Sequence, residues 1–377
     1  MKSVSLWSAG AIMFLLMAGA AFGDETPWYK NIDIAADMTD VFQGSPGVSA
    51  ANIDGAVKPS MSFDVEFTLQ TSKSGTAYVK FKSGVGEGID ALIPTFSGFN
   101  GDAYDDLTPY PAEAWYEHAF GEKARLRFGK LDLTTDFDTN AIANSETEQF
   151  LSGGFVNNAA VALPDDNSLG AMLWVSPIKL FDVGFGFADA AADWDNVFKN
   201  PFFILELDLK PEIKGKPGNY RFYAWHNGKD HERLIVEGTD PNYGYGISAD
   251  QEVADGITAF FRYGRQRSGV APANHVWSAG AEISGKIPRR ENDSVGIAYG
   301  QSIIGNGWKS LAQEAGIDSC NESHLELYYK VKVTDFMSVS PNVQWVNNSE
   351  GNKGNKGVWA FGFRMQFNAN ILKRRQS

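Results

Sequence analysis

The feature that most constrains the fold is an alternation of apolar and polar residues that recurs along the chain. In residues 61–69, every odd position is apolar and every even position is polar or charged. The same pattern occupies residues 77–82, 125–128, 203–209, 220–225, 257–263, 325–331 and 359–367. Successive side chains of a β-strand point to opposite faces, so each run predicts a strand with one apolar and one polar face. No long stretch after the first 23 residues has a helical period, and the prediction is an all-β protein.

Composition narrows the class of protein further. An apolar content of 43% excludes intrinsic disorder, and a single cysteine, Cys320, excludes both a disulfide framework and a cysteine-based zinc site. The longest apolar run, residues 9–22, is shorter than the roughly 18 residues that a membrane-spanning helix needs. A helical membrane protein is therefore not expected.

The N-terminal run is typical of a secretory signal peptide. Lys2 precedes an apolar stretch over residues 9–17, and residues 21–23 form a small-x-small cleavage site. Cleavage of residues 1–23 would leave 32 basic and 46 acidic residues, because Lys2 is the one charged residue removed, and 32 − 46 gives a net charge of −14. Such a chain is a poor candidate for binding nucleic acid, which rewards clustered lysine and arginine.

Sixteen strand segments are predicted, with long and short connections alternating between them. The segments are 30–40, 61–70, 76–83, 112–120, 124–131, 168–177, 181–189, 202–210, 218–227, 242–251, 257–266, 275–285, 293–301, 322–333, 337–346 and 357–367. The long connections are 41–60, 84–111, 132–167, 190–201, 228–241, 302–321 and 347–356. The exception on that side is the short connection 267–274.

A meander with long loops at one end and tight turns at the other is the layout of an outer-membrane β-barrel. The bilayer requires closure, since an open sheet edge leaves backbone groups unpaired in hydrocarbon. An even number of strands places both chain ends in the periplasm. The prediction is a sixteen-stranded antiparallel transmembrane β-barrel in the outer membrane of a Gram-negative-type cell, in contact with its lipid. A soluble β-sandwich remains the alternative.

The polar face of each strand then lines the lumen. The expected inward basic residues are Lys80, Lys82, Arg125, Arg127, Arg221, Arg262 and Arg364. The expected inward acidic residues are Asp64, Glu66, Glu206, Asp208, Glu282 and Glu326. A barrel of about sixteen strands leaves an aqueous channel in which such charges stay hydrated.

The longest connection, 132–167, contains no lysine or arginine. Its acidic residues are Asp132, Asp136, Asp138, Glu146, Glu148, Asp165 and Asp166. Two interpretations stand: a solvated loop outside the barrel, or a loop folded into the lumen that sets carboxylates opposite Arg125 and Arg127. In the second case the charges would decide which solutes pass, and the amides of Asn140 and Gln149 would hydrogen-bond sugar hydroxyls.

Two inward aromatic residues, Tyr223 and Trp225, also have two interpretations. They would offer flat faces to pyranose rings, or they would pack against a loop inside the lumen. The predicted constriction and solute-contacting set combines loop and wall residues. It comprises Arg125, Arg127, Lys130, Asp132, Asp136, Asp138, Asn140, Glu146, Glu148, Gln149, Arg221, Trp225 and Arg262.

Several stretches resemble one protein family. The run Arg127-Phe-Gly-Lys-Leu-Asp-Leu-Thr-Thr-Asp-Phe-Asp-Thr-Asn140 is similar to the signature stretch of the carbohydrate-selective porins, the OprB-type family. Further similar stretches follow in order at 143–150, 155–158, 218–222 with 224–225, 244–251, 261–264, 326–331, 339–345 and 361–367.

The resemblance implies a sixteen-stranded porin through which sugars diffuse passively, and a homotrimer. It also implies that the third long loop enters the lumen, where Lys130, Asp132, Asp138, Asn140, Glu146 and Gln149 belong to the constriction region. Residues 31–110 match the family weakly. The expected organisation is a signal peptide at 1–23, a barrel at 24–367 and a basic C-terminal tail at 368–377.

Other functions remain as alternatives. These are a general or ion-selective porin, an outer-membrane enzyme and an adhesin with an occluded lumen. The enzyme rests only on Asp230 and His231 in one loop, and His226 with His231 lacks the spacing of a zinc site. We expect no catalysis, no cofactor and no metal.

Overall fold

The computed structural model describes residues 28–48, 53–164, 167–194, 197–287 and 289–374. The expected signal peptide, residues 1–23, and the loop residues Asp165 and Asp166 lie outside these ranges. Within them, no helix is both long and apolar enough to cross a membrane.

Sixteen long strands and one strand of two residues make up the described wall. The first eight are β1 (Ile32–Val48), β2 (Ile53–Gln70), β3 (Gly75–Val85), β4 (Tyr110–Phe120), β5 (Ala124–Leu131), β6 (Ser168–Ile178), β7 (Phe181–Asp189) and β8 (Pro201–Leu209). The rest are the two-residue β9 (Glu212–Ile213), then β10 (Lys216–Glu232), β11 (Thr239–Ala254), β12 (Ile257–Gln266), β13 (Ala273–Ser284), β14 (Ser294–Ile304), β15 (Glu322–Lys332), β16 (Met337–Asn347) and β17 (Val358–Leu372).

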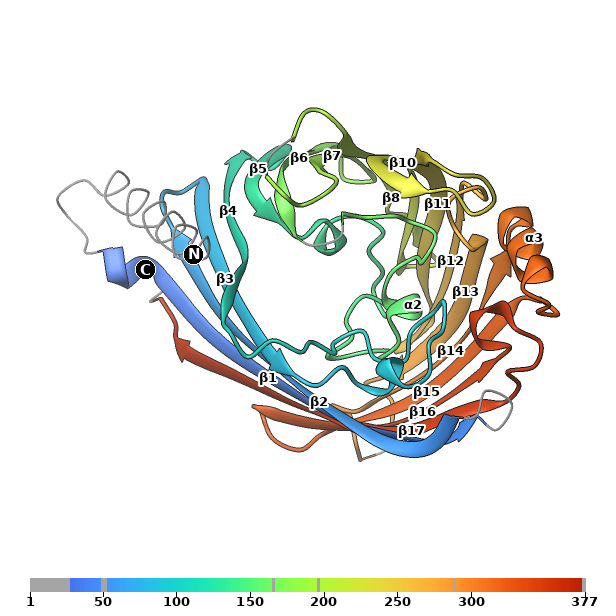
Figure 1. Ribbon diagram of the computed structural model, residues 1–377. Coiled ribbons are helices and arrows are strands. Elements are labelled where there is room, and N and C mark those ends of the chain that lie inside the picture. Colours follow the sequence, from blue (N-terminus) through green and yellow to red (C-terminus); the bar gives the residue numbers. More distant parts are fainter. Residues whose placement is uncertain (1–27, 49–52, 165–166, 195–196, 288, 375–377) are drawn as a thin grey trace.

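The strands close into a barrel. Each long strand pairs antiparallel with the next one along the chain, and β1 pairs with both β2 and β17. The closing register places Thr39 opposite Gln366 and Phe42 opposite Phe363. Figure 1 shows the resulting ring of strands around an open centre. The predicted all-β, sixteen-stranded antiparallel barrel is confirmed.

Some strands extend further than the apolar pattern indicates. Most of the connection expected at 41–60 is instead paired strand, because β1 continues to Val48 and β2 begins at Ile53. The connection expected at 228–241 is shortened in the same way by β10 and β11. Pairs such as Gln43 with Lys58 continue the ladder where apolar side chains no longer occupy alternate positions. The hydrogen bonds persist there although the hydrophobic signal ends.

The last strand also continues past the boundary expected at residue 367. β17 runs to Leu372, which pairs with Ile34 of β1, and Asn368 pairs with Asp37. Half of the ten residues expected as a tail, 368–372, therefore belong to the barrel wall. Beyond them, the Arg374 guanidinium lies 3.3 Å from Asp33.

Two long connections fold into the lumen. The connection between β5 and β6 contains η4 (Leu133–Thr135) and α2 (Gly153–Val156), and Figure 1 shows α2 inside the ring. The connection between β3 and β4, with η3 (Ile89–Ala91), lies beside it. We call these segments inner loop A (residues 132–167) and inner loop B (residues 86–109). The expected inward fold of loop A is confirmed.

The remaining helices lie elsewhere. Helix α3 (Asn306–Glu314) lies at the outside of the ring in Figure 1, between β14 and β15 in the chain. The short segments η1 (Trp28–Asn31) and η5 (Ser349–Gly351) precede β1 and follow β16. Neither inner loop contains more than one turn of α-helix in its described part.

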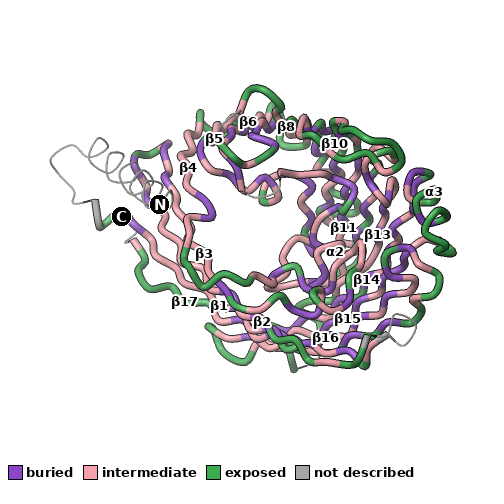
Figure 2. Tube along the Cα trace, viewed as in Figure 1, coloured by how far each residue is buried: buried purple, intermediate pink, exposed green. Residues whose placement is uncertain are grey.

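The core lies between the inner loops and the wall. Phe150 and Phe155 of loop A pack against Phe260 and Tyr328, with the rings of Phe150 and Tyr328 5.1 Å apart. Figure 2 shows buried residues along β11–β16, where the loops cover the wall, and mainly intermediate ones along β3 and β4. A side chain at Gly246 would collide with Tyr223, whose hydroxyl oxygen lies 2.4 Å and whose nearest ring carbon lies 2.5 Å from the position of its Cβ. Glycine there lets Tyr223 lie flat on the wall.

Candidate functional site in the lumen

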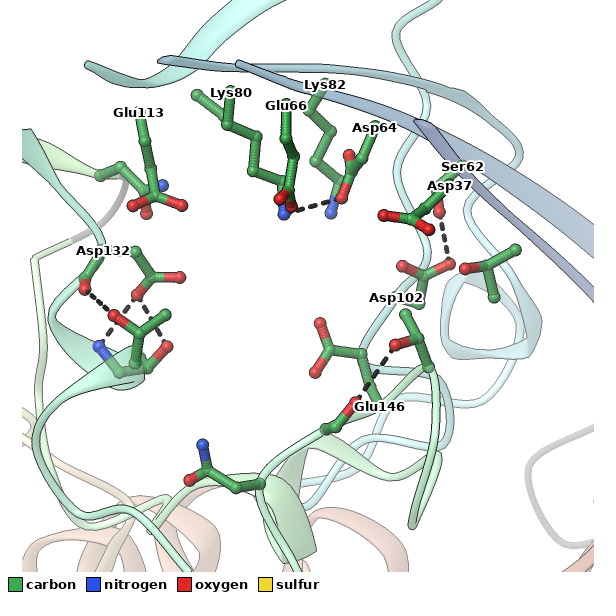
Figure 3. Close-up of a pocket in the computed structure, with 18 of the residues that line it drawn as sticks. Asp37, Ser62, Asp64, Glu66, Lys80, Lys82, Asp102, Glu113, Asp132 and Glu146 are labelled. Carbon is green, nitrogen blue, oxygen red and sulfur yellow. Dashed lines mark hydrogen bonds and ion pairs between the residues drawn. The ribbon is translucent and has the colours of Figure 1, made fainter. Parts of the chain in front are cut away.

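An open cavity of about 630 Å³ lies between the barrel wall and the inner loops. On the wall side, alternation in β1–β4 points every second side chain inward. Asp64 and Glu66 of β2 and Lys80 and Lys82 of β3 reach the cavity in this way. Figure 3 shows these four side chains projecting from the wall, with Glu113 of β4 beside them.

The inner loops form the opposite side. Loop A contributes Asp132, Glu146 and Glu148, and loop B contributes Asp102. In Figure 3, Glu146 faces the wall residues across the opening, whereas Asp102 lies beside Ser62 of the wall. Asp132 also begins η4, where its Oδ1 accepts hydrogen bonds from Thr134 N and Oγ1 at 2.9 and 2.7 Å. The cavity is therefore bounded by the strand wall on one side and by both inner loops on the other.

Carboxylates dominate the charge of the cavity lining. Among the described lining residues, eight are acidic and two are basic. The acidic ones are Asp37, Asp64, Glu66, Asp102, Glu113, Asp132, Glu146 and Glu148, and the basic ones are Lys80 and Lys82. Lys80 forms a salt bridge of 2.7 Å with Asp64. The formal charge of the lining is 2 − 8 = −6 when all ten groups are ionised.

Burial shifts the ionisation of the loop carboxylates. Ser62 Oγ donates to Asp102 Oδ2 at 2.7 Å, but burial outweighs this bond and raises the pKa of Asp102 to about 7. Burial also raises the pKa of Glu146. The pKa of Glu148 is lowered, because hydrogen bonds from Lys330 and Asn368 outweigh the opposing effect of its burial.

An arginine of the wall anchors loop A. The Nε of Arg262, on β12, lies 3.1 Å from Asp138 Oδ1, and its two terminal nitrogens donate to the carbonyls of Asp138 and Phe155 at 2.6 Å. The other oxygen of Asp138 accepts from Asn158 N at 2.7 Å, and Asp138 N donates to Glu206 at 2.8 Å. The buried charges of Arg262 and Asp138 are therefore both hydrogen-bonded, as buried charges require, whereas Glu206 Oε1 has no hydrogen-bond partner among the described residues.

A wall carboxylate and a second arginine anchor the middle of loop A. Glu326, on β15, accepts hydrogen bonds from Leu151 N and Ser152 N at 2.6 and 3.0 Å. Arg364, on β17, donates to the carbonyls of Glu146 and Gln149 at 2.5 and 3.0 Å. These bonds fix Glu146 at the edge of the cavity.

Loop B is hydrogen-bonded to loop A and to β15, the strand that also carries Glu326. Glu322, on β15, accepts from Phe96 N and Ser97 N at 2.9 and 3.0 Å. Gly101 N donates to the Leu151 carbonyl at 2.8 Å, which joins the loops directly. Sequence reasoning did not assign loop B to the lumen. The available signal was its apolar content, since Ile89 and Phe99 are fully buried against β16 and β17.

The predicted arginine pair lies in the lumen wall but outside the cavity lining. Arg125 forms a salt bridge of 3.0 Å with Glu117, and its other terminal nitrogen contacts Asp136. Arg127 lies 2.6 Å from Asp136 and stacks over Trp115 at 4.1 Å. Both arginines therefore have carboxylate partners at close range.

The other predicted residues separate into cavity and anchor positions. Of the thirteen, Asp132, Glu146 and Glu148 line the cavity. Arg221 pairs with Asp250 at 2.8 Å, Asn140 Nδ2 donates to Ser248 at 3.2 Å, and Lys130 Nζ donates to the Pro111 carbonyl at 3.0 Å.

Gln149 and the two aromatic residues have structural contacts. The side chain of Gln149 accepts from Asn144 N at 2.7 Å within loop A. Tyr223 and Trp225 are almost fully buried in a cluster with Phe137 of loop A. Of the two interpretations of this pair, the structure agrees with packing against a loop.

No group of three or more His, Cys, Asp or Glu residues in the described ranges is placed to hold a metal ion.

Comparison with known protein families identifies a match over most of the chain. The family model of the carbohydrate-selective porins, OprB family, matches residues 83–368. The chain belongs to the OprB family. The match starts within β3 and continues through most of β17, so it includes both inner loops and most of the cavity lining, but not the lining residues of β1, β2 and the first part of β3. With the closed barrel, family membership makes this an outer-membrane β-barrel protein.

Solved porins share the fold at low sequence identity. The high-pH structure of OprB from Pseudomonas putida has a TM-score of 0.79 at 17% identity, over 90% of this chain and 95% of that one. A mutant porin of Rh. blastica has a TM-score of 0.55 at 12% identity, over 89% of this chain and 100% of that one. An uncharacterised protein of Aquifex aeolicus (strain VF5) is 23% identical over 246 residues, and the match spans 65% of each chain.

Proposed function

We propose that the protein allows carbohydrates to diffuse passively through its lumen across the outer membrane. The observation that carries the proposal is membership of the carbohydrate-selective porin family over residues 83–368, which include most of the cavity lining. The lining supplies carboxylates, two ammonium groups, hydroxyls and amides. These groups replace the hydrogen bonds that a sugar loses when it leaves water.

Anchored loops support selective rather than unrestricted passage. The anchors on β12, β15 and β17 hold the loop residues Asp138, Leu151 and Glu146 against the wall. A fixed opening selects solutes by size and by the position of its hydrogen-bonding groups. We propose that Asp132, Glu146 and Glu148, together with the facing wall carboxylates and lysines, form the constriction.

Single-channel conductance in a planar bilayer tests the proposal. The expected result is stable conductance steps that glucose blocks at saturable concentrations, with longer oligosaccharides blocking over a different concentration range. Steps that sugars leave unchanged would point to the second candidate, a general or ion-selective porin. The excess of carboxylates around the cavity is the observation that favours ion selectivity.

We also propose a homotrimer. Asp40 of β1 lies on the outer face, because its neighbours Thr39 and Val41 point inward, and it is paired in register with Met61 and Met365. A carboxylate facing hydrocarbon is unfavourable, so contact with another barrel would relieve this cost. Native mass spectrometry of the purified protein in detergent should give the mass of three chains, and a monomer mass would contradict the proposal.

The family and the fold imply a channel rather than an enzyme, and we expect the purified protein to have no catalytic activity. A measurable lipase or protease activity that disappears in His231→Ala would contradict this expectation.

A further inference from the structure

A polar cluster lies on the outer face of the barrel near its extracellular end. In β12 the inward positions are Phe260, Arg262 and Gly264, so Arg265 points outward, and it is exposed. Arg265 lies one residue from the end of β12, on the side of the long connections. Its cross-strand partners are Tyr245 of β11 and His275 of β13.

Arg265 differs from the neighbouring arginines, because no carboxylate among the described residues pairs with it. Arg233 and Arg267 share the carboxylate of Asp240, at 2.8 and 2.5 Å. In the described part of the chain, the Arg265 guanidinium has neither a hydrogen bond nor an ion pair. Its positive charge is therefore unpaired at the outer surface.

The outward residues around Arg265 include no carboxylate. At its level on the adjacent strands lie Ala224, Tyr245, His275 and Ile303, and one level toward the periplasm lie Phe222, Ile247, Tyr263, Trp277 and Gln301. Asp240 of β11 is five residues from Tyr245, ~16 Å along the strand at ~3.3 Å per residue, and its carboxylate is paired with Arg233 and Arg267.

Aromatic side chains place this cluster in the membrane interface. Tyr243 and Tyr245 are about half exposed, and Trp277 packs edge to face against Tyr299 at 5.7 Å. Tyrosine and tryptophan concentrate where hydrocarbon meets headgroups. The Tyr263 hydroxyl and His275 Nδ1 lie 2.7 Å apart, which adds polar groups beside Arg265.

We propose that Arg265, with Tyr245, Tyr263 and His275, binds the phosphate of a phosphorylated lipid of the outer leaflet. A guanidinium is suited to phosphate because its planar set of donors matches two phosphate oxygens. The tyrosine rings contact the upper acyl region, while their hydroxyls remain at headgroup level. The site uses the outer face of the barrel, so it is independent of the proposed passage of sugars.

Native mass spectrometry in detergent tests the site. The probes are lipid A carrying both phosphates and the same lipid without them, each titrated against wild type, Arg265→Gln and Arg290→Gln. Arg290 is a matched control because it lies on the opposite rim, in the turn 285–293, where it pairs with Asp293. We expect Arg265→Gln to weaken binding of phosphorylated lipid about fivefold, the effect of one basic residue at a membrane surface, and Arg290→Gln to leave it unchanged.

Further arms separate the possible outcomes. Arg265→Lys should retain part of the affinity, and Tyr245→Phe should lose less than Arg265→Gln, so the proposal remains testable if one variant does not fold. Equal binding of both lipids, or equal affinity of Arg265→Gln and wild type, would overturn it. Displacement of the lipid by millimolar inorganic phosphate would show a free-phosphate site instead. Pore conductance should stay at the wild-type value in Arg265→Gln, which separates this test from that of the channel.

Discussion

At the scale of single residues, the cavity contains both paired and unpaired charges. Lys80 is neutralised by Asp64 at 2.7 Å, while Glu148 is bonded to Lys330. Asp132 and Glu146 have no ion pair in the described structure. We therefore expect the field in the opening to come from unpaired carboxylates, rather than from loop carboxylates set opposite Arg125 and Arg127, the arrangement predicted from the sequence.

A first prediction concerns ion selectivity. The double variant Asp132→Asn with Glu146→Gln removes two unpaired negative charges and should lower the preference for cations, measured as the reversal potential in a salt gradient. Lys82→Met should raise it, because a basic lining residue is lost. Arg125→Ala with Arg127→Ala is the comparison, since these arginines lie outside the cavity lining and are paired with Glu117 and Asp136. A larger shift in the arginine variant than in the carboxylate variant would place the constriction at the arginines.

A second prediction concerns pH. Burial raises the pKa of Asp102 to about 7, so this carboxyl loses its charge as the pH falls through 7. Because the folded pKa exceeds the value of about 3.9 for an unfolded aspartate, ionisation of Asp102 costs stability as the pH rises from about 4 to above 7. Cation preference should fall between pH 8 and pH 6 in wild type, and Asp102→Asn should flatten that change and raise the thermal midpoint at pH 8. A wild-type step that survives in Asp102→Asn would assign the titration to another group.

At the scale of elements, the strands and the inner loops differ in how far local sequence determines them. Alternation in β2 or β12 is a local property, and it correctly predicted which side chains point inward. The place of loop B depends on contacts with strands more than two hundred residues away, such as Phe96 N with Glu322. The identity of the cavity residues depends on where both loops come to rest. For this reason Lys80 and Glu66 were predicted to be inward without being assigned to the site.

A third prediction tests the anchoring of loop A. Arg262→Ala leaves Asp138 in the barrel without its counter-charge, and breaking a buried pair from one side costs about 3–5 kcal/mol. We expect the loop to leave its position, with higher and noisier single-channel conductance and faster hydrogen exchange over residues 138–158. Arg265→Ala is a matched control on the same strand, since that side chain points outward. Unchanged conductance and exchange in Arg262→Ala would show that the contacts on β15 and β17 hold the loop without Arg262.

At the scale of the whole molecule, closure makes the barrel one structural unit. The strand pairs β1–β2 and β1–β17 join the two ends of the chain, and the inner loops join opposite walls across the lumen. Asn368 takes part both in the closing strand pair and in the contacts of loop A. It pairs with Asp37 in the closing register and donates to Glu148 of loop A at 2.9 Å. Residues near the end of the described chain therefore affect the cavity as well as the seam.

A last prediction follows for the seam. Deleting residues 368–377 removes the pairs that join Asn368 to Asp37 and Leu372 to Ile34, whereas deleting 375–377 leaves all of them in place. We expect the longer deletion to lower the unfolding temperature of the barrel, because an unpaired β1 edge is unfavourable in the membrane. Gel electrophoresis measures this temperature, since the folded barrel and the unfolded chain migrate at different rates. It should also alter conductance through the loss of Asn368 from the cavity lining. The shorter deletion is the control for chain length. Equal thermal midpoints for the two deletions would show that pairing up to Phe367 is sufficient to close the barrel.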